Sequence, residues 1–128
     1  MSFSQPRLHA STILLCDDDV EILDLLKPAF IDAGHEVIAV RTSEEAWKIL
    51  NLQKIDCVLS DIRIGEGSGV ELAKKIHQEF SSIPLYLMTG FQDYQGHEVR
   101  EFGVEAIFFK PFIIEDLIET VALKLQSM

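Results

Sequence analysis

The feature that most limits what this chain can fold into is a regular alternation of short apolar runs with longer amphipathic stretches. The short runs are rich in Ile, Val, Leu or aromatic residues, and each is too short for a stable helix. They span Thr12–Cys16, Glu36–Val40, Asp56–Ser60, Ile83–Met88 and Glu105–Phe109. Runs that are apolar at nearly every position are typical of strands buried on both faces, as in a parallel sheet.

Amphipathic stretches with helical periodicity separate and follow these runs. We expect helices over Val20–Ala33, Ser43–Leu52, Val70–Phe80, Asp93–Phe102 and Ile114–Gln126. Strands that alternate with helices imply right-handed crossover connections. The pattern therefore predicts the α/β class, with an open, doubly wound parallel sheet that carries helices on both faces.

Two local predictions concern the first two helices. Ser43 is the predicted N-cap of the second helix, since Ser is favoured at that position and two glutamates follow it. In the first helix, four apolar residues recur at helical spacing. The predicted buried face there consists of Ile22, Leu25, Leu26 and Ala29.

The length and charge of the chain narrow the possible functions. A chain of 128 residues is the size of one domain, and we assign residues 11–128 to it and residues 1–10 to a disordered or extended N-terminal segment. Lys and Arg number 11 against 21 Asp and Glu, so the net charge is −10. Such a chain repels phosphate backbones, and direct nucleic-acid binding is not expected.

Membrane insertion and secretion are not expected either. No apolar run approaches the ~20 residues of a membrane span, and the first ten residues lack the apolar core of a secretory signal. Cys16 and Cys57 lie inside apolar runs, which predicts buried, reduced thiols rather than a disulfide. We therefore expect a cytoplasmic protein.

The residues that follow four of the five predicted strands could form a functional site, whereas Arg41 and Thr42 after the second strand suggest nothing comparable. Ligands of open α/β sheets bind outside the carboxyl ends of the strands, so these positions share one edge of the sheet. The residues at these strand ends are Asp17, Asp18 and Asp19 after the first, Asp61 after the third, Thr89 after the fourth and Lys110 after the fifth. Carboxylates, a hydroxyl and an ammonium group are thus expected to converge.

Crowded carboxylates favour a bound cation. Two like charges ~4 Å apart repel by about 4 kcal/mol at an effective dielectric constant of ~20, so the groups raise one another's pKa values or collect a cation. Oxygen ligands without a nearby His or Cys pair suit Mg²⁺. With the cation bound, a phosphate can approach Lys110 and Thr89. A carboxylate, a cation, an ammonium group and a hydroxyl together are the groups that phosphoryl transfer to an aspartate requires.

Four segments of the sequence, taken in order, resemble the receiver domain of two-component response regulators. They are ILLCDDD, VLSDIRI with Gly69 eight residues beyond Asp61, LMTG and FFKPF. The resemblance extends from about Thr12 to Leu125. It implies a (βα)5, flavodoxin-like fold with strand order 2-1-3-4-5, and a Mg²⁺-dependent signalling switch controlled by phosphorylation.

The resemblance also implies a role for each matching residue. Asp61 matches the phosphoacceptor, and Asp17 and Asp18 match the acidic pair that binds Mg²⁺ with it. Asp18 is the expected direct ligand, Asp17 acts through water, and Arg63 contributes its backbone carbonyl. Asp19 receives no role in metal binding.

The remaining matches lie on the last two strands. Thr89 matches the switch hydroxyl and Lys110 the phosphate-binding lysine, with the bond between Lys110 and Pro111 expected to be cis. Ile107 stands where the family often has Phe or Tyr, and Ile64 and Gly65 stand where it often has Met-Pro. The segment 65–69 is rich in glycine. We expect this segment to be looser than in relatives.

The partners implied by the resemblance are proteins. A sensor histidine kinase or a histidine phosphotransfer protein supplies the phosphoryl group, and a downstream target contacts the last two helices and the fifth strand. Whether the chain forms a homodimer stays open. The domain is expected to catalyse only its own phosphorylation and dephosphorylation, so it is not an enzyme with a separate substrate.

Two alternatives remain open on the sequence. The first is a pseudo-receiver, a docking module that is never phosphorylated, and it is kept open by Ile107 and the altered loop. The second is a phosphatase of the haloacid-dehalogenase kind, with Asp17 as nucleophile and Asp19 as acid/base. This phosphatase needs further acids on a later strand, and it leaves Asp61 without a role.

Overall fold

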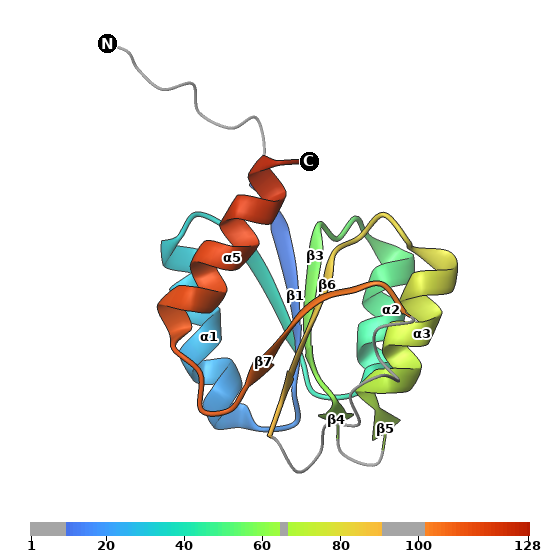
Figure 1. Cartoon of the computed structure of the whole chain (residues 1–128). Coiled ribbons are helices and arrows are strands. Elements are labelled where there is room, and N and C mark those ends of the chain that lie inside the picture. The colour runs from blue at the N-terminus through green and yellow to red at the C-terminus, as the bar shows by residue number, and fades with distance from the viewer. Residues whose placement is uncertain (1–9, 65–66, 91–101) are drawn as a thin grey trace.

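A single parallel sheet forms the centre of the molecule (Figure 1). The computed structural model describes residues 10–64, 67–90 and 102–128. The strands of the sheet are β1 (Thr12–Cys16), β2 (Glu36–Val40), β3 (Cys57–Asp61), β6 (Leu85–Thr89) and β7 (Val104–Phe109). Their order is β2-β1-β3-β6-β7, and every neighbouring pair is parallel. This arrangement confirms the predicted α/β fold with strand order 2-1-3-4-5.

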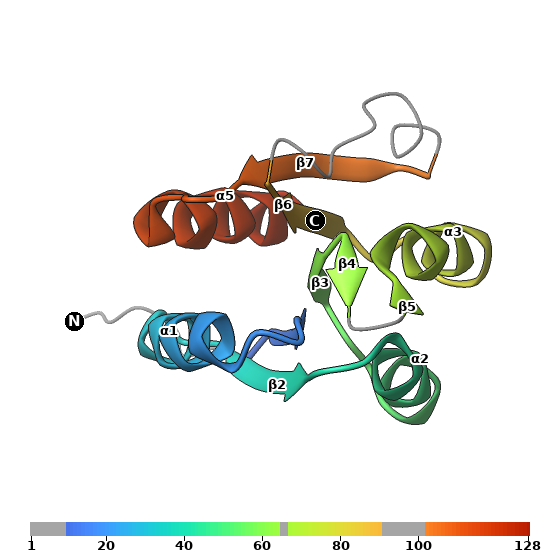
Figure 2. The same ribbon diagram turned by 90° about the horizontal axis from the view of Figure 1, so that it is seen from below.

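Helices cover both faces of the sheet. They are α1 (Val20–Asp32), α2 (Ser43–Leu52), α3 (Gly69–Glu79) and α5 (Ile114–Gln126). Figure 2 shows α1 and α5 on one face and α2 and α3 on the other, as a doubly wound sheet requires. The bounds of these four helices agree with the predicted ones to within one residue. The helix predicted over Asp93–Phe102 lies outside the described residues, except for Phe102.

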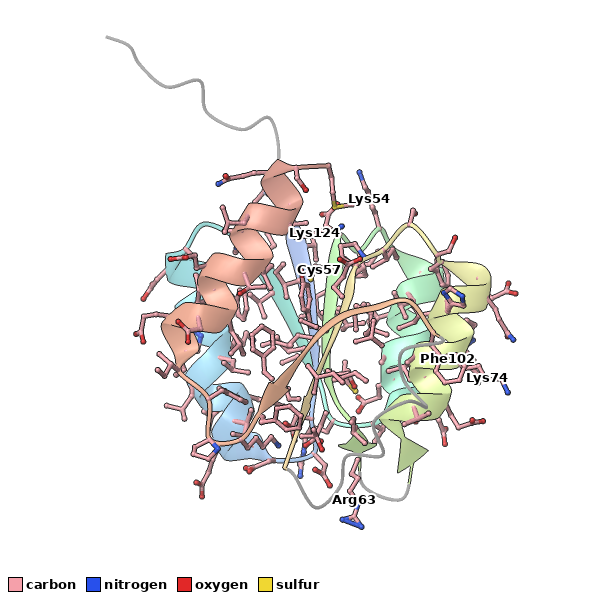
Figure 3. The ribbon with its side chains drawn as sticks, in the orientation of Figure 1. Lys54, Cys57, Arg63, Lys74, Phe102 and Lys124 are labelled. Carbon is pink, nitrogen blue, oxygen red and sulfur yellow. The ribbon has the colours of Figure 1, made fainter. Side chains whose placement is uncertain are left out.

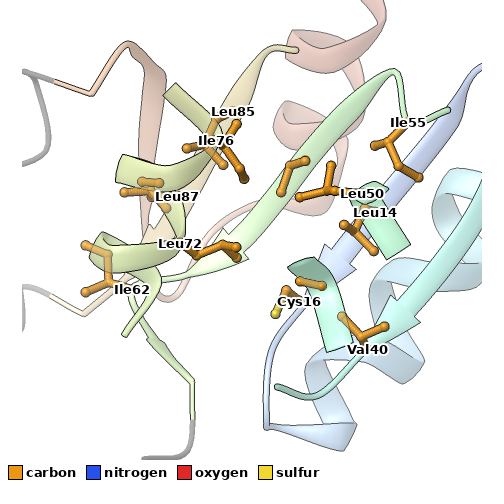
Figure 4. Packing of buried hydrophobic residues seen from close by; sticks show 13 residues of the cluster. Leu14, Cys16, Val40, Leu50, Ile55, Ile62, Leu72, Ile76, Leu85 and Leu87 are labelled. Carbon is orange, nitrogen blue, oxygen red and sulfur yellow. The ribbon is translucent and has the colours of Figure 1, made fainter. Parts of the chain in front are cut away.

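Apolar side chains fill the space between the sheet and both helical layers (Figure 3). One hydrophobic cluster lies on the side of α2 and α3, where Leu14 and Cys16 of β1 pack with Leu72 and Ile76 of α3 (Figure 4). The other lies on the side of α1 and α5 and receives the alternate β1 residues, Ile13 and Leu15. The central strands are therefore buried on both faces, which confirms the inference drawn from their continuous apolar runs.

Several local predictions differ from the structure. The strand predicted over Ile83–Met88 spans Leu85–Thr89, and the one predicted over Glu105–Phe109 begins one residue earlier, at Val104. Thr42, not Ser43, caps α2, because its hydroxyl accepts a 3.0 Å hydrogen bond from the Glu45 amide. The strand predicted over Asp56–Ser60 begins and ends one residue later, at Cys57 and Asp61. Leu25 is 57% exposed rather than in the core.

The position of Leu25 follows from the rotation of α1 about its axis. The residues of α1 that are buried against the sheet are Leu23, Leu26 and Phe30. Successive residues of an α-helix point ~100° apart, so a face centred on these three turns Leu25 outward. Ile22 packs partly against the same cluster, and the predicted stripe was therefore correct for part of its length.

Two predicted absences can be compared with the described part of the chain. None of its helices has both the length and the apolar character that a membrane crossing requires. Cys16 and Cys57 are buried free thiols, as predicted. Burial raises the pKa of each to about 12, with nearby carboxylates adding to the shift, so both thiols stay protonated at neutral pH.

Candidate functional site

The carboxyl ends of three strands bring the predicted charged residues together. Asp17 directly follows β1, Asp61 is the last residue of β3, and Lys110 directly follows β7. β1 and β3 are hydrogen-bonded neighbours, and Cys16 pairs with Ser60 one residue before each aspartate. Two residues at matching ends of adjacent parallel strands start only one strand spacing apart, ~4.8 Å. The sheet therefore places the two carboxylates side by side.

Asp17, Asp18 and Asp61 form the group called here the acid cluster. Each contributes one carboxylate oxygen, and these oxygens all lie within 4.8 Å of one another. Asp17 is buried, Asp61 is half-buried and Asp18 is exposed. Three carboxylate oxygens at this spacing, open to solvent on one side, fit a hard divalent cation such as Mg²⁺, which prefers oxygen ligands and retains several waters.

Lys110 joins two members of the acid cluster. Its Nζ lies 2.7 Å from Asp61 Oδ2 and 3.4 Å from Asp17 Oδ2. Burial by itself would lower the pKa of Lys110, but the hydrogen bond to Asp61 and the charges of both carboxylates outweigh it, so the pKa is raised. The ammonium group therefore stays charged at neutral pH and neutralises part of the cluster.

Asp17 is the least exposed carboxylate of the acid cluster, and its side chain is fully buried. Burial raises its pKa to about 6, and the charge of Asp61 adds to the shift. A hydrogen bond from the Asp19 amide, 2.9 Å from Asp17 Oδ1, and the Lys110 ammonium act in the opposite direction. A second positive charge at the cluster would favour the ionised form of Asp17 further.

Asp61 is held at both carboxylate oxygens. Oδ2 accepts the bond from Lys110, and Oδ1 accepts a 3.1 Å bond from the Arg63 amide. The Arg63 side chain is exposed and points away from the sheet (Figure 3). The main chain of Arg63 thus lies beside Asp61 while its guanidinium does not, and the metal-binding role of its carbonyl stays a prediction.

The connection from β3 to α3 contains two short strands. They are β4 (Arg63–Ile64) and β5 (Gly67–Ser68), which pair as an antiparallel ladder. The residues between them lie outside the described part of the chain, so the expected looseness of segment 65–69 stays a prediction. Gly69 then donates a 2.6 Å hydrogen bond to the Ile62 carbonyl. A Cβ atom on Gly69 would overlap the Asp61 carbonyl oxygen, so only glycine fits this approach.

Thr89 stands at the correct edge, but its hydroxyl makes a local contact. The residue is 1% exposed, and its Oγ1 donates a 3.0 Å bond to the Gly90 carbonyl. Its own carbonyl accepts a 2.7 Å bond from the Lys110 amide. Thr89 is therefore tied to Lys110 through the main chain, while its hydroxyl proton is not directed at the acid cluster.

The end of β7 matches two further expectations in different ways. The bond between Lys110 and Pro111 is cis, as predicted. Ile107 pairs in register with Leu87 and packs against the cluster beneath α2 and α3. Phe109 is the residue that pairs with Thr89. Phe108 and Phe109, the aromatic residues of β7, thus lie one and two positions closer to Lys110 than the family pattern places the aromatic residue.

Two contacts of the site had not been expected from the sequence. The close approach of Gly69 to Asp61 was missed, although the spacing of Gly69 eight residues beyond Asp61 had been noted as part of the family pattern. The Gly90 carbonyl that binds Thr89 carries no sequence signal, because every residue has a carbonyl.

Asp19 has a structural role that bears on one alternative. Its carboxylate accepts a 3.0 Å bond from the Glu21 amide and caps α1. The phosphatase alternative requires Asp19 as a free acid/base and Asp17 as an accessible nucleophile. The capping bond of Asp19 and the burial of Asp17 disfavour both assignments.

Comparison with known proteins gives one family consistently. The response regulator receiver domain model matches residues 13–122. The response regulator protein FleR of Pseudomonas aeruginosa is 30% identical over 115 residues, which cover 88% of this chain and 24% of FleR. The polar-differentiation response regulator DivK of Brucella ovis is 29% identical over 113 residues, which cover 86% of this chain and 92% of DivK.

A solved structure shares the fold. The CheY-like response regulator receiver domain protein of Methanospirillum hungatei superimposes with a TM-score of 0.84 at 29% identity, covering 93% of this chain and 96% of that protein. The relatives differ in length, since the chain covers 17% of the transcriptional regulatory protein GlrR of Escherichia coli but 92% of DivK.

Proposed function

Because the chain belongs to the response regulator receiver domain family, we propose that it is a Mg²⁺-dependent signalling switch that accepts a phosphoryl group on Asp61. The observation that carries the proposal is the 2.7 Å bond from Lys110 Nζ to Asp61 Oδ2 at the centre of the acid cluster. A half-buried carboxylate beside an ammonium group and two further carboxylates has the components of aspartyl phosphorylation.

The phosphoryl transfer follows from the positions of these residues. An oxygen of Asp61 attacks phosphorus, and the bond from phosphorus to the donor's imidazole nitrogen breaks. Asp17 and Asp18 would hold Mg²⁺ together with Asp61, and the bound ion supplies neutralisation of the phosphoryl oxygens. Lys110 transfers its hydrogen bond from the Asp61 carboxylate to a phosphoryl oxygen, and its raised pKa keeps it charged for this role.

Thr89 is the proposed responding residue. To reach a phosphoryl group on Asp61, its hydroxyl has to leave the Gly90 carbonyl, to which it is bonded at 3.0 Å. The exchange of one hydrogen bond for another is a two-state change that phosphorylation can bias. The Thr89 carbonyl is bonded to the amide of Lys110, which directly follows β7. A shift of Thr89 would therefore move the end of β7 as well.

The proposed partners are proteins. A sensor histidine kinase or a histidine phosphotransfer protein supplies the phosphoryl group, and a downstream target contacts β7, α5 and the predicted helix over residues 93–102. The pair formed by Lys124 of α5 and Glu105 of β7, 3.2 Å apart, lies on this surface. We propose a cytoplasmic location, and a regulatory role in place of turnover of a separate substrate.

The proposal is tested by incubation with Mg²⁺ and acetyl phosphate, followed by intact mass measurement. The wild-type chain should gain one phosphoryl group, and Asp61→Asn should abolish the adduct. Asp19→Asn is the matched control, since Asn also caps helices well and α1 should be retained. An adduct on Asp17 would overturn the assignment of Asp61, and no adduct from any donor would favour the pseudo-receiver.

A further inference from the structure

Asp18 and Asp61, two residues of the acid cluster, line a cleft that also has an apolar wall. The cleft has a volume of about 820 Å³, and Asp18, Asp61 and Lys110 line its polar end. The apolar wall consists of Ile22, Leu25 and Leu26 from α1 and Pro111, Phe112 and Ile114 from the start of α5 and the connection before it. Figure 1 shows the start of α1 and this connection at the same end of the molecule as the carboxyl ends of the strands.

The apolar wall is anchored in the core and open on the outside. Leu26 is fully buried in the cluster beneath α1 and α5, and Phe112 and Ile114 pack against that cluster. Leu25, in contrast, is 57% exposed and lines the cleft. An apolar surface with an exposed leucine at its outer part is suited to cover an apolar group of a ligand.

We propose that this wall makes the site selective for acyl phosphates with an apolar acyl chain as small-molecule phosphodonors. The inference rests on the proposed function, because it concerns the donor that phosphorylates Asp61. The volume of about 820 Å³ lies within the ~300–1,000 Å³ of small-molecule sites. The phosphoryl group fits the polar end, where Lys110 lies and where the acid cluster would hold Mg²⁺, and the acyl chain fits the apolar wall.

The direction of attack places the acyl chain away from Asp61. In an in-line displacement, the nucleophile and the leaving group lie on opposite sides of phosphorus. An Asp61 carboxylate oxygen forms the new bond to phosphorus, and the bond from phosphorus to the acyl oxygen breaks. The electron pair leaves with the carboxylate of the departing acid, so no proton or redox partner is required.

Two matched donors measure the selectivity. Acetyl phosphate and butyryl phosphate differ by two methylene groups, while their departing acids are nearly equal in strength, so their intrinsic reactivity is matched. Each fully buried methylene group raises the rate constant about fourfold. With the chain partly buried, we expect the second-order rate constant for butyryl phosphate to exceed that for acetyl phosphate about tenfold.

The experiment measures both rate constants with Mg²⁺ by intact mass, at donor concentrations well below saturation. Leu25→Ser should reduce the preference for butyryl phosphate to about threefold or less. Leu52→Ser is the control, because Leu52 is 71% exposed on α2, on the opposite face of the sheet. This control should retain the preference of the wild-type chain.

The outcomes separate this inference from the proposed function. Equal rate constants for the two donors, with the phosphoryl group on Asp61, overturn the selectivity and leave the switch intact. A tenfold preference that survives Leu25→Ser overturns the assignment to this wall. No adduct from either donor overturns the proposed function and this inference with it.

Discussion

The acid cluster and the end of β6 are two parts of one site, and they are held in different ways. Lys110 bonds to Asp61 and Asp17, which are 49 and 93 residues away in the chain. Thr89, at the end of β6, bonds through its hydroxyl to the next residue, Gly90. The cluster is therefore assembled by contacts between distant strands, whereas the hydroxyl is held by a purely local bond.

This difference separates binding from response. Groups that already converge on one point can receive a charged ligand with little rearrangement, which is what electrostatic preorganisation requires. A hydroxyl with a local partner has to exchange that bond before it can take part. We therefore expect changes in the acid cluster to alter phosphorylation strongly and changes at Thr89 to alter mainly the response that follows.

The largest effect is expected for Lys110→Met, which keeps the chain length and removes the charge. Loss of one preorganised donor to a developing charge typically costs ~10²–10³ in rate, so phosphorylation by acetyl phosphate should slow at least about a hundredfold. The control is Lys124→Met, since Lys124 also pairs with a carboxylate, Glu105, but on the surface. Similar rates for the two variants would contradict the role of Lys110.

Gly69→Ala tests whether the packing beneath Asp61 matters to the acid cluster. The added methyl group would overlap the Asp61 carbonyl, and overpacking of this kind costs ~1–3 kcal/mol in the free energy of unfolding. Phosphorylation should slow as well, because the main chain of Asp61 has to move. Urea unfolding and intact mass measure the two effects.

Gly34→Ala is the control for this variant. Gly34 has a φ of +100° with open space around it, so alanine there should cost ~1–2 kcal/mol through the backbone alone. It should leave phosphorylation unchanged. If both glycine variants phosphorylate at the wild-type rate, the contact between Gly69 and Asp61 has no bearing on the site.

Asp17→Asn should stabilise the protein at pH 7 in the presence of a chelator. The folded-state pKa of Asp17 is about 6, against 3.8 for the unfolded chain, so the folded state binds more protons between these values and stability falls as the pH rises through them. At ~1.4 kcal/mol for each pH unit, the ionised carboxyl lowers the free energy of unfolding by ~2–3 kcal/mol at pH 7.

Urea unfolding at several pH values checks this sign. The wild-type chain should lose stability from Asp17 between about pH 4 and pH 6, and Asp17→Asn should lack that loss. The variant should also gain less stability from added Mg²⁺, because it has lost one carboxylate of the cluster. Asp24→Asn, on the exposed face of α1, is the control and should change stability by no more than ~0.5 kcal/mol.

The smallest effect on phosphorylation is expected for Thr89→Val, which keeps the shape and removes the hydroxyl. Loss of the bond to the Gly90 carbonyl should cost ~1 kcal/mol in stability, and the rate of phosphorylation should stay within about threefold. In the wild-type chain, phosphorylation should change the NMR chemical shifts of the β7 amides, and in Thr89→Val this change should disappear. Thr89→Ser retains the hydroxyl and should restore it; a full response in Thr89→Val would contradict the separation of binding from response.

Much of this molecule is determined by the sequence alone. Continuous apolar runs and helical periodicity define the sheet and four of its helices, because burial on two faces and burial on one face require different spacings. Once the strands are recognised, the residues of the acid cluster follow, since the carboxyl ends of parallel strands share one edge.

The tertiary structure alone decided how those residues are used. It set the rotation of α1 that turns Leu25 into the cleft, the burial that raises the pKa of Asp17, and the local partner of the Thr89 hydroxyl. Each of these depends on atoms contributed by elements far apart in the chain, or on a choice between competing hydrogen-bond partners. Periodicity and spacing describe one segment at a time, so they carry no information about which of several possible partners a side chain contacts.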